Sequence, residues 1–181
     1  MNKTRVSKSC VQGDLPGKIA KEFSPELAFP VSLIFDNIVQ TGEWPLIWKI
    51  ETGISLGKTL DPKTEDQLRV ISLTSYLSKQ FEQFVVIWLL EYVSSHLDWG
   101  QYGGRKGTSI SHYLIDFMNF ILFNQDLAVP HALVAMMVDF SKAFNRINHN
   151  IIITTLSDMG VPGWLLKIVI GFLSNRELIV R

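Results

Sequence analysis

The sequence has little of several features that define whole classes of protein. A single cysteine, Cys10, among 181 residues excludes an internal disulfide and a cysteine-rich zinc site. The 17 basic and 17 acidic side chains balance, so no strongly positive surface for a polyanion is indicated. The longest apolar runs, 84–90 and 132–138, are far shorter than the ~18 residues that span a bilayer. We therefore expect an intracellular protein without a membrane segment.

What the sequence does contain is typical of one folded domain. Hydrophobic residues make up 47% of the chain, with 11 phenylalanines and 5 tryptophans, which is too apolar for a disordered segment. The length lies within the ~100–200 residues of a single domain. A chain of this size can bury a core without disulfides or metals.

Hydrophobic periodicity predicts mixed α and β structure in the first half. Residues 1–23 are polar and contain glycine and proline, so we expect a loosely held lead-in. A helix is predicted to begin with Ser24 as its cap and to end at Thr41-Gly42. Apolar residues then alternate over 50–56, and a second strand-like run covers 69–73, which together predict a hairpin.

Four helices and two strands are predicted after the hairpin. Helical spacing marks residues 77–93, and a glycine-rich loop over 99–107 precedes a helix capped by Thr108 or Ser109. The continuous apolar run 132–138 predicts a central strand that is buried on both faces. The remaining elements are helices over about 150–159 and 162–173 and a strand from Glu177. This order of elements is that of an α+β or α/β domain.

Asp139, directly after the run 132–138, is the residue best placed for chemistry. A carboxylate at the end of a buried strand can hold a hydrated cation at a cleft. The same position equally suits a helix cap or a turn, and the residues alone leave both interpretations open. One carboxylate cannot hold two divalent ions, so two-metal chemistry would need further ligands.

Other candidate motifs are weaker. Residues 53–59, GISLGKT, are similar to a phosphate-binding P-loop but are one residue short and precede no predicted helix, so an NTPase is the weaker alternative. The histidines show no paired spacing for metal ligands. The aromatic residues of 81–92 keep helical spacing, which predicts a core face rather than a base-stacking surface.

Five ordered motifs resemble those of reverse transcriptases from non-LTR (LINE- or jockey-like) retrotransposons. Residues 138–149, VDFSKAFNRINH, resemble the first catalytic motif of that family, L/V-D-F-S-K-A-F-D-x-V/I-x-H. The other four are TGEWP followed by WK at 41–49, RVISLT at 69–74, QYGGRKG at 101–107 and GFLSNR at 171–176. The resemblance covers about residues 12–181.

The resemblance implies a right-hand polymerase that copies an RNA template from a DNA primer with dNTPs. Residues 24–130 would form a fingers-like region, and 131–181 would be the start of the palm. In the family, two Mg²⁺ ions are held by the first-motif aspartate and by a later Y-x-D-D motif; here the metal site would include Asp139 and Phe140. Because no Y-x-D-D occurs in these residues, we expect an N-terminal fragment that is inactive alone.

The resemblance also implies how the dNTP would be bound. Lys58 and Arg69 would contact the triphosphate with their charges. The main-chain amides of Lys142 and Ala143 would donate to its phosphates, and Phe144 would lie beneath the sugar.

A second hypothesis belongs to a different class of function. The missing Y-x-D-D is also what we would expect of a non-catalytic retrotransposon remnant, retained as an RNA-binding or protein-interaction module. The balanced charge gives this module little electrostatic help, because RNA binding normally depends on phosphate contacts.

Overall fold

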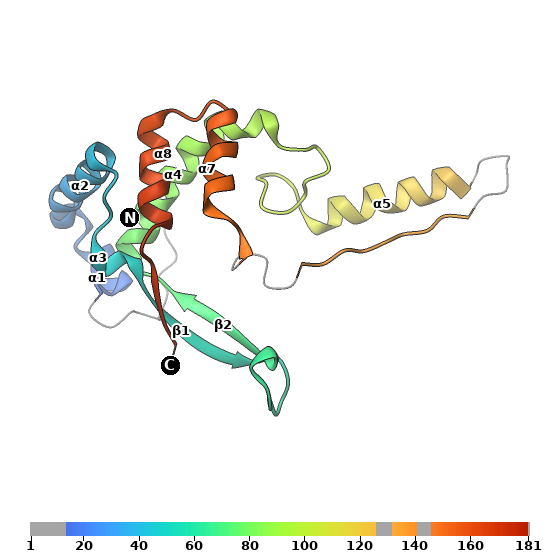
Figure 1. Ribbon diagram of the computed structural model, residues 1–181, viewed down its shortest axis with the longest axis horizontal. Helices are drawn as coiled ribbons and strands as arrows, with labels where there is room; N and C mark the ends of the chain where they lie inside the picture. Colours follow the sequence, from blue (N-terminus) through green and yellow to red (C-terminus); the bar gives the residue numbers. More distant parts are fainter. Residues whose placement is uncertain (1–13, 126–131, 141–145, 181) are drawn as a thin grey trace. The chain divides into compact units, whose positions relative to one another are not determined.

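A computed structural model of the chain describes residues 14–125, 132–140 and 146–180 (Figure 1). These residues divide into two compact units. The first consists of the chain up to Val93 together with His149–Arg181, and the second is Ser94–Asn148. Helices and one small sheet make up the structure, in agreement with the predicted mixed class. The assignment of 24–130 to fingers and 131–181 to palm stays a prediction.

The first unit combines helices with a three-stranded sheet. The helices are α1 (Gly17–Glu22), α2 (Ser24–Thr41), α3 (Leu46–Lys49), α4 (Tyr76–Val93), α7 (His149–Asp158) and α8 (Gly163–Leu173). The strands are β1 (Ile50–Gly57), β2 (Leu68–Leu73) and β3 (Glu177–Val180), and a short 3-10 turn, Glu65–Gln67, precedes β2. None of the described helices is both long and apolar enough to cross a membrane.

Helix α2 has the predicted bounds, but its N-terminal cap differs. Ser24 is the first helical residue, and Phe23 occupies the N-cap position. Pro30 lies inside the helix without ending it. At the other end Gly42 adopts a left-handed conformation with φ of 76°, and its N–H donates to the Ile38 carbonyl at 2.8 Å. Such a C-cap strongly favours glycine, so the Thr41-Gly42 stop is confirmed.

Part of the predicted lead-in is folded and belongs to the first unit. Residues 17–22 form α1, in which Ala20 is fully buried. Just before it, the Asp14 carboxylate accepts hydrogen bonds from the Ser75 hydroxyl at 2.9 Å and from the Tyr76 N–H at 2.7 Å. An acceptor at the first N–H groups of a helix satisfies donors that have no partner within it. Asp14 therefore caps α4 from a distant part of the sequence.

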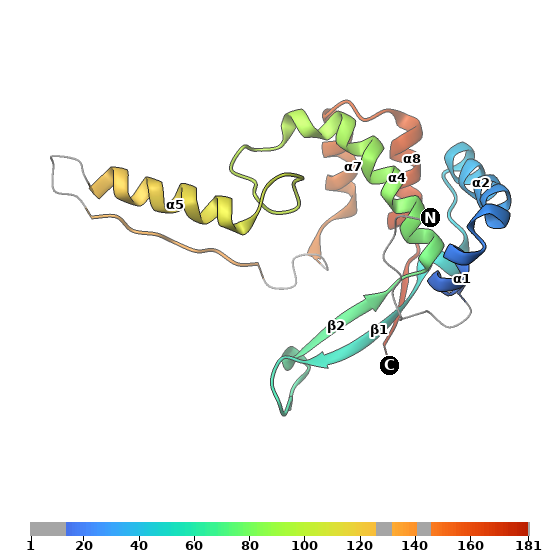
Figure 2. The same ribbon diagram turned by 180° about the vertical axis from the view of Figure 1, so that it is seen from behind.

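The sheet has the strand order β2–β1–β3 (Figure 2). The predicted hairpin is confirmed: β1 and β2 are antiparallel, with Ile54 opposite Ile71 and Leu56 opposite Arg69. The predicted C-terminal strand is also present, and it pairs in parallel with β1, placing Ile50 opposite Glu177. The first and last strands of the described chain are thus neighbours.

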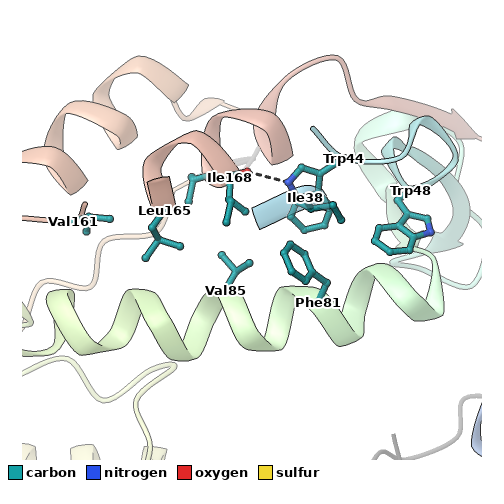
Figure 3. Close-up of a cluster of buried hydrophobic side chains, with 9 residues drawn as sticks. Ile38, Trp44, Trp48, Phe81, Val85, Val161, Leu165 and Ile168 are labelled. Carbon is teal, nitrogen blue, oxygen red and sulfur yellow. Dashed lines mark hydrogen bonds between the residues drawn. The ribbon is translucent and has the colours of Figure 1, made fainter. Parts of the chain in front are cut away.

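The core of the first unit forms where α2, α3 and α4 meet α8 (Figure 3). The predicted apolar face of α4 contributes Phe81 and Val85, which are 1% and 7% exposed. Trp44, in the turn after α2, donates its indole N–H to the Ile168 carbonyl at 2.9 Å. The buried cluster consists of Ile38, Trp44, Trp48, Phe81, Val85, Val161, Leu165, Ile168 and Val169.

Helix α8 approaches the turn after α2 so closely that only glycine fits at Gly171. A Cβ placed there would lie 1.9 Å from the Gly42 carbonyl oxygen and 3.1 Å from Cδ1 of Trp44. Because the nearest atom is a backbone oxygen, no side-chain rotation can relieve the clash. Gly171 therefore sets the distance between α8 and the α2–α3 turn.

The second unit contains the 3-10 turn Ser94–His96, helix α5 (Ile110–Gln125) and the extended segment 132–140. The prediction of a buried central strand at 132–138 is wrong in this structure. The segment has no regular secondary structure, and Val134 and Met136 are 86% and 85% exposed. A strand needs a neighbour to bond its main-chain groups, and among the described residues none pairs with this segment.

We expect Gly171→Ala to destabilise the first unit. The added methyl would have to push the Gly42 backbone away, and overpacking of this kind costs about 1–3 kcal/mol. For a chain of this length that is a melting temperature about 2–10 °C lower, measured by circular dichroism. Gly163→Ala is the matched control in the same helix, because a Cβ there meets nothing within 4 Å. Equal melting temperatures for the two variants would contradict the steric argument.

Candidate functional site

The hairpin carries the two predicted triphosphate-binding cations, Lys58 and Arg69. Arg69 lies in β2 opposite Leu56. Lys58 directly follows β1, and its N–H donates to the Gln67 carbonyl at 2.7 Å. Arg69 is the second residue of β2, so both cations lie toward the tip of the hairpin. Both residues are exposed.

A long, exposed connection joins the two strands of the hairpin between Gly57 and Leu68. A Cβ on Gly57 would lie 2.8 Å from the Thr59 carbonyl oxygen, so glycine permits the bend that follows β1. The Lys63 N–H donates to the Gln67 side-chain carbonyl at 2.6 Å. Lys58 therefore lies at the start of a loop that is held at its far end by Gln67.

The P-loop interpretation of residues 53–59 is wrong. A P-loop wraps a phosphate with main-chain N–H groups at the start of a helix. Here residues up to Gly57 belong to β1, and a bend leads to β2 through the three-residue 3-10 turn Glu65–Gln67. No helix opens at this loop, so the NTPase alternative is abandoned.

Val70, in the motif at 69–74, takes part in the hairpin. It lies opposite Ser55 in the register. Its side chain fills space beside Gly53, where an added Cβ would lie 2.8 Å from Val70 Cγ1 and 3.3 Å from Val180 Cγ2. Gly53 therefore leaves room for the branched side chains of both neighbouring strands.

The base of the hairpin is held to α8 by an ion pair. Arg176 donates from Nε to Oε1 of Glu51 at 2.9 Å, and its Nη2 contacts the same oxygen. Its Nη1 donates to the Phe172 carbonyl at 3.3 Å, and the guanidinium lies 4.3 Å from the centre of the Phe172 ring. The side chains of the pair are each 19% exposed, so water screens this pair less than a surface pair. We call these three residues, Glu51, Phe172 and Arg176, the hairpin clip.

Sequence reasoning assigned no role to Glu51 or Arg176. Glu51 alternates with apolar residues along β1, a pattern that normally indicates solvent exposure. Arg176 ends the FLSNR motif, which marked it as a family residue without showing its partner. The two lie 125 positions apart, and only the parallel pairing of β1 with β3 brings them together.

Asp139 and Phe140 lie at the end of the extended segment of the second unit. Asp139 is exposed, and Phe140 is 76% exposed. The other predicted dNTP contacts, Lys142, Ala143 and Phe144, lie outside the described residues. Within the described part of the chain no group of three His, Cys, Asp or Glu side chains could hold a metal ion. The carboxylate and carbonyl oxygens of Asp139 and Phe140 suit Mg²⁺, but they supply only part of a coordination sphere.

A comparison with protein-family models identifies the chain. The model of reverse transcriptase (RNA-dependent DNA polymerase) matches residues 61–180, well over half of the sequence. The chain belongs to the reverse transcriptase family. In this reverse transcriptase chain the matched range includes Arg69, Asp139 and Arg176 of the hairpin clip. Lys58 and Glu51 precede the matched range. No characterised protein matches the chain when sequences are compared one by one.

Removing the arginine of the hairpin clip should loosen the base of the hairpin. Arg176→Ala leaves the Glu51 carboxylate partly buried without its hydrogen bonds, at a cost of about 1–3 kcal/mol. We expect a melting temperature lower by about 2–10 °C. Lys63→Ala is the control, because its pair with Asp61 spans 3.9 Å and both side chains are at least 80% exposed, which makes it worth little.

A double-mutant cycle of Glu51→Gln with Arg176→Ala tests the pairing directly. Residues in contact show non-additive effects of roughly 0.5–3 kcal/mol, whereas independent residues do not. Additive losses would mean that the two side chains contribute separately.

Proposed function

We propose that this chain provides the fingers and the first catalytic aspartate of an RNA-directed DNA polymerase from a non-LTR retrotransposon. The observation that carries the proposal is the motif at 138–149, which lies inside the range matched by the reverse transcriptase family. The four other motifs in their family order support the retrotransposon subtype. The reaction is the template-directed transfer of a deoxynucleotide to the 3′-hydroxyl of a DNA primer paired with RNA.

In this proposal Asp139 binds metal. Its carboxylate, with the main-chain carbonyl of Phe140, would hold Mg²⁺ together with a Y-x-D-D motif that lies outside these residues. When bound, the metal pair supplies positive charge at the attacking and leaving oxygens. Asp139 is exposed, so its carboxylate is open to ligands and ions that other segments would supply.

Lys58 and Arg69 would bind the triphosphate of the incoming dNTP. Two cations toward the same end of a hairpin can contact an extended polyanion together, and charge-assisted hydrogen bonds are the stronger class. The hairpin clip supports this role, because it joins β1, which leads to Lys58, to the end of α8. Lys142 and Ala143 would add main-chain donors to the phosphates.

We expect Asp139→Asn to abolish polymerisation while nucleic-acid binding persists. The test is a chimera in which this chain is followed by the Y-x-D-D segment and thumb of an active family member, assayed by primer extension on RNA with Mg²⁺. Asparagine keeps the shape and suits turns, but it lacks the charge that holds a cation. Asp158→Asn, at the exposed end of α7, is the control. Activity of Asp139→Asn within a few-fold of the parent would assign Asp139 to turn formation.

The chain of 181 residues serves as the negative control in the same assay. It carries no Y-x-D-D, so we expect no incorporation from it. An inactive chimera, with the family member active in its own context, would favour the non-catalytic remnant.

Phe144→Val should relax the choice of sugar in the same chimera. If the ring lies beneath the sugar, it excludes a 2′-hydroxyl by its volume, and discrimination of that kind is worth roughly 10²-fold. We expect ribonucleotide incorporation to rise about 10–100-fold, with a much smaller loss for the dNTP. The measurement is kcat/KM for a matched rNTP and dNTP. Equal losses for both, with a lower melting temperature, would instead indicate a core phenylalanine.

A further inference from the structure

Trp99 is an exposed tryptophan in a loop that contains one of the family motifs. Its side chain is 85% exposed, whereas Trp44 and Trp48 are each 5% exposed. The loop connects the 3-10 turn Ser94–His96 to α5 in the second unit. Tryptophan is highly buried on average, so an indole left in solvent needs an explanation.

Hydrogen bonds shape the loop around Trp99. The Asp98 carboxylate accepts from the Gly100 N–H at 2.7 Å, and the Asp98 carbonyl accepts from the Gln101 N–H at 3.1 Å. On the other side, the Tyr102 hydroxyl donates to the Asp116 carboxylate on α5, and this hydrogen bond raises the pKa of Tyr102. The indole therefore projects from a loop that is tied to itself and to a helix.

A cation lies against the indole. The Arg105 guanidinium carbon is 5.0 Å from the centre of the Trp99 ring, within the range of a cation–π interaction. The same guanidinium donates from Nη1 to the Asp98 carbonyl at 3.3 Å, which holds it there. One face of the ring is thus occupied by a fixed charge.

The surroundings of Trp99 are open and carry positive charge. Lys106 is exposed next to Arg105. Gly100, which directly follows Trp99 in sequence, borders an open hollow of about 350 Å³ that is also lined by Gln101, Tyr102, Gly103, Ile110 and Tyr113. An exposed aromatic ring with adjacent cations is the chemistry that recognises a nucleobase and its phosphate.

We propose that Trp99 and Arg105 form a stacking site for a base of single-stranded RNA. The inference rests on the proposed function, to which it adds a contact for unpaired template. The base stacks on the open face of the indole, and Arg105 and Lys106 contact its phosphates. Stacking contributes independently of net charge, which suits a chain whose acidic and basic side chains are equal in number. A base within a duplex cannot reach the ring, so the site selects single strands.

The experiment measures binding of the 181-residue chain to fluorescein-labelled single-stranded RNA of about 12 nucleotides by fluorescence anisotropy. We expect Trp99→Ala to weaken binding about 5–150-fold, the range for loss of one stacked base. Trp99→Phe, which keeps an aromatic face, should recover most of the affinity. Circular dichroism verifies that the variants retain the helical content of the parent.

Phe123→Ala is the matched control, because Phe123 is an aromatic residue of α5 that is 71% exposed. It should bind RNA as the parent does. Undetectable binding by the parent, unchanged binding by Trp99→Ala, or an equal loss in Phe123→Ala would each overturn the stacking site. An equal loss for an RNA duplex would do so as well, because it would show that stacking on an unpaired base is not involved.

The two proposals fail differently. If the chimera polymerises but Trp99→Ala binds RNA normally, only the stacking site is wrong. If the chimera is inactive and Trp99 still governs RNA binding, the polymerase assignment fails and the site stands as an RNA contact of a non-catalytic chain.

Discussion

The contact between α8 and the turn after α2 is the constraint on which the first unit depends. Gly171 lets α8 lie directly against the Gly42 carbonyl, and the Trp44 indole donates to the Ile168 carbonyl. This contact positions α3, which leads without a linker into β1. Helix packing therefore positions the base of the hairpin. The hairpin clip adds a second attachment, because it joins Glu51 of β1 to the end of α8.

Local signals were sufficient to predict most helices and the hairpin. Ser24-Pro25 marks the start of α2 and Gly42 marks its end, and each signal depends on residues within one helical turn. The alternation over 50–56 is a property of β1 alone. Signals that act between distant residues were not visible: Asp14 capping α4 and β3 pairing in parallel with β1. The run 132–138 has the composition of a buried strand, but composition does not supply the neighbour that a strand requires.

The family motifs divide into two kinds once their places are known. The motifs at 41–49 and 171–176 contact each other in the core, where the ring centres of Trp44 and Phe172 lie 5.1 Å apart. These two motifs stabilise the fold. The motif at 69–74 contains Arg69, and the motif at 101–107 contains Arg105, which lies against Trp99. These two motifs place positive charge at the surface. The resemblance implies that Lys58 and Arg69 bind the triphosphate together; the hairpin carries both residues, and their role stays a prediction. A metal site needs oxygen ligands from several segments, so Asp139 alone could not define it.

The separation of contacting residues has a consequence for synthesis on the ribosome. Trp44 and Glu51 are synthesised before their partners Ile168 and Arg176, which follow 124 and 125 positions later in the chain. At ~5–20 residues per second, that interval lasts roughly 6–25 s. Throughout it the aromatic side chains of α3 and α4 lack their cover from α8, so the nascent chain presents tryptophan and phenylalanine to solvent. The apolar segments of the N-terminal half therefore stay uncovered longest during synthesis, and a slower ribosome lengthens that exposure.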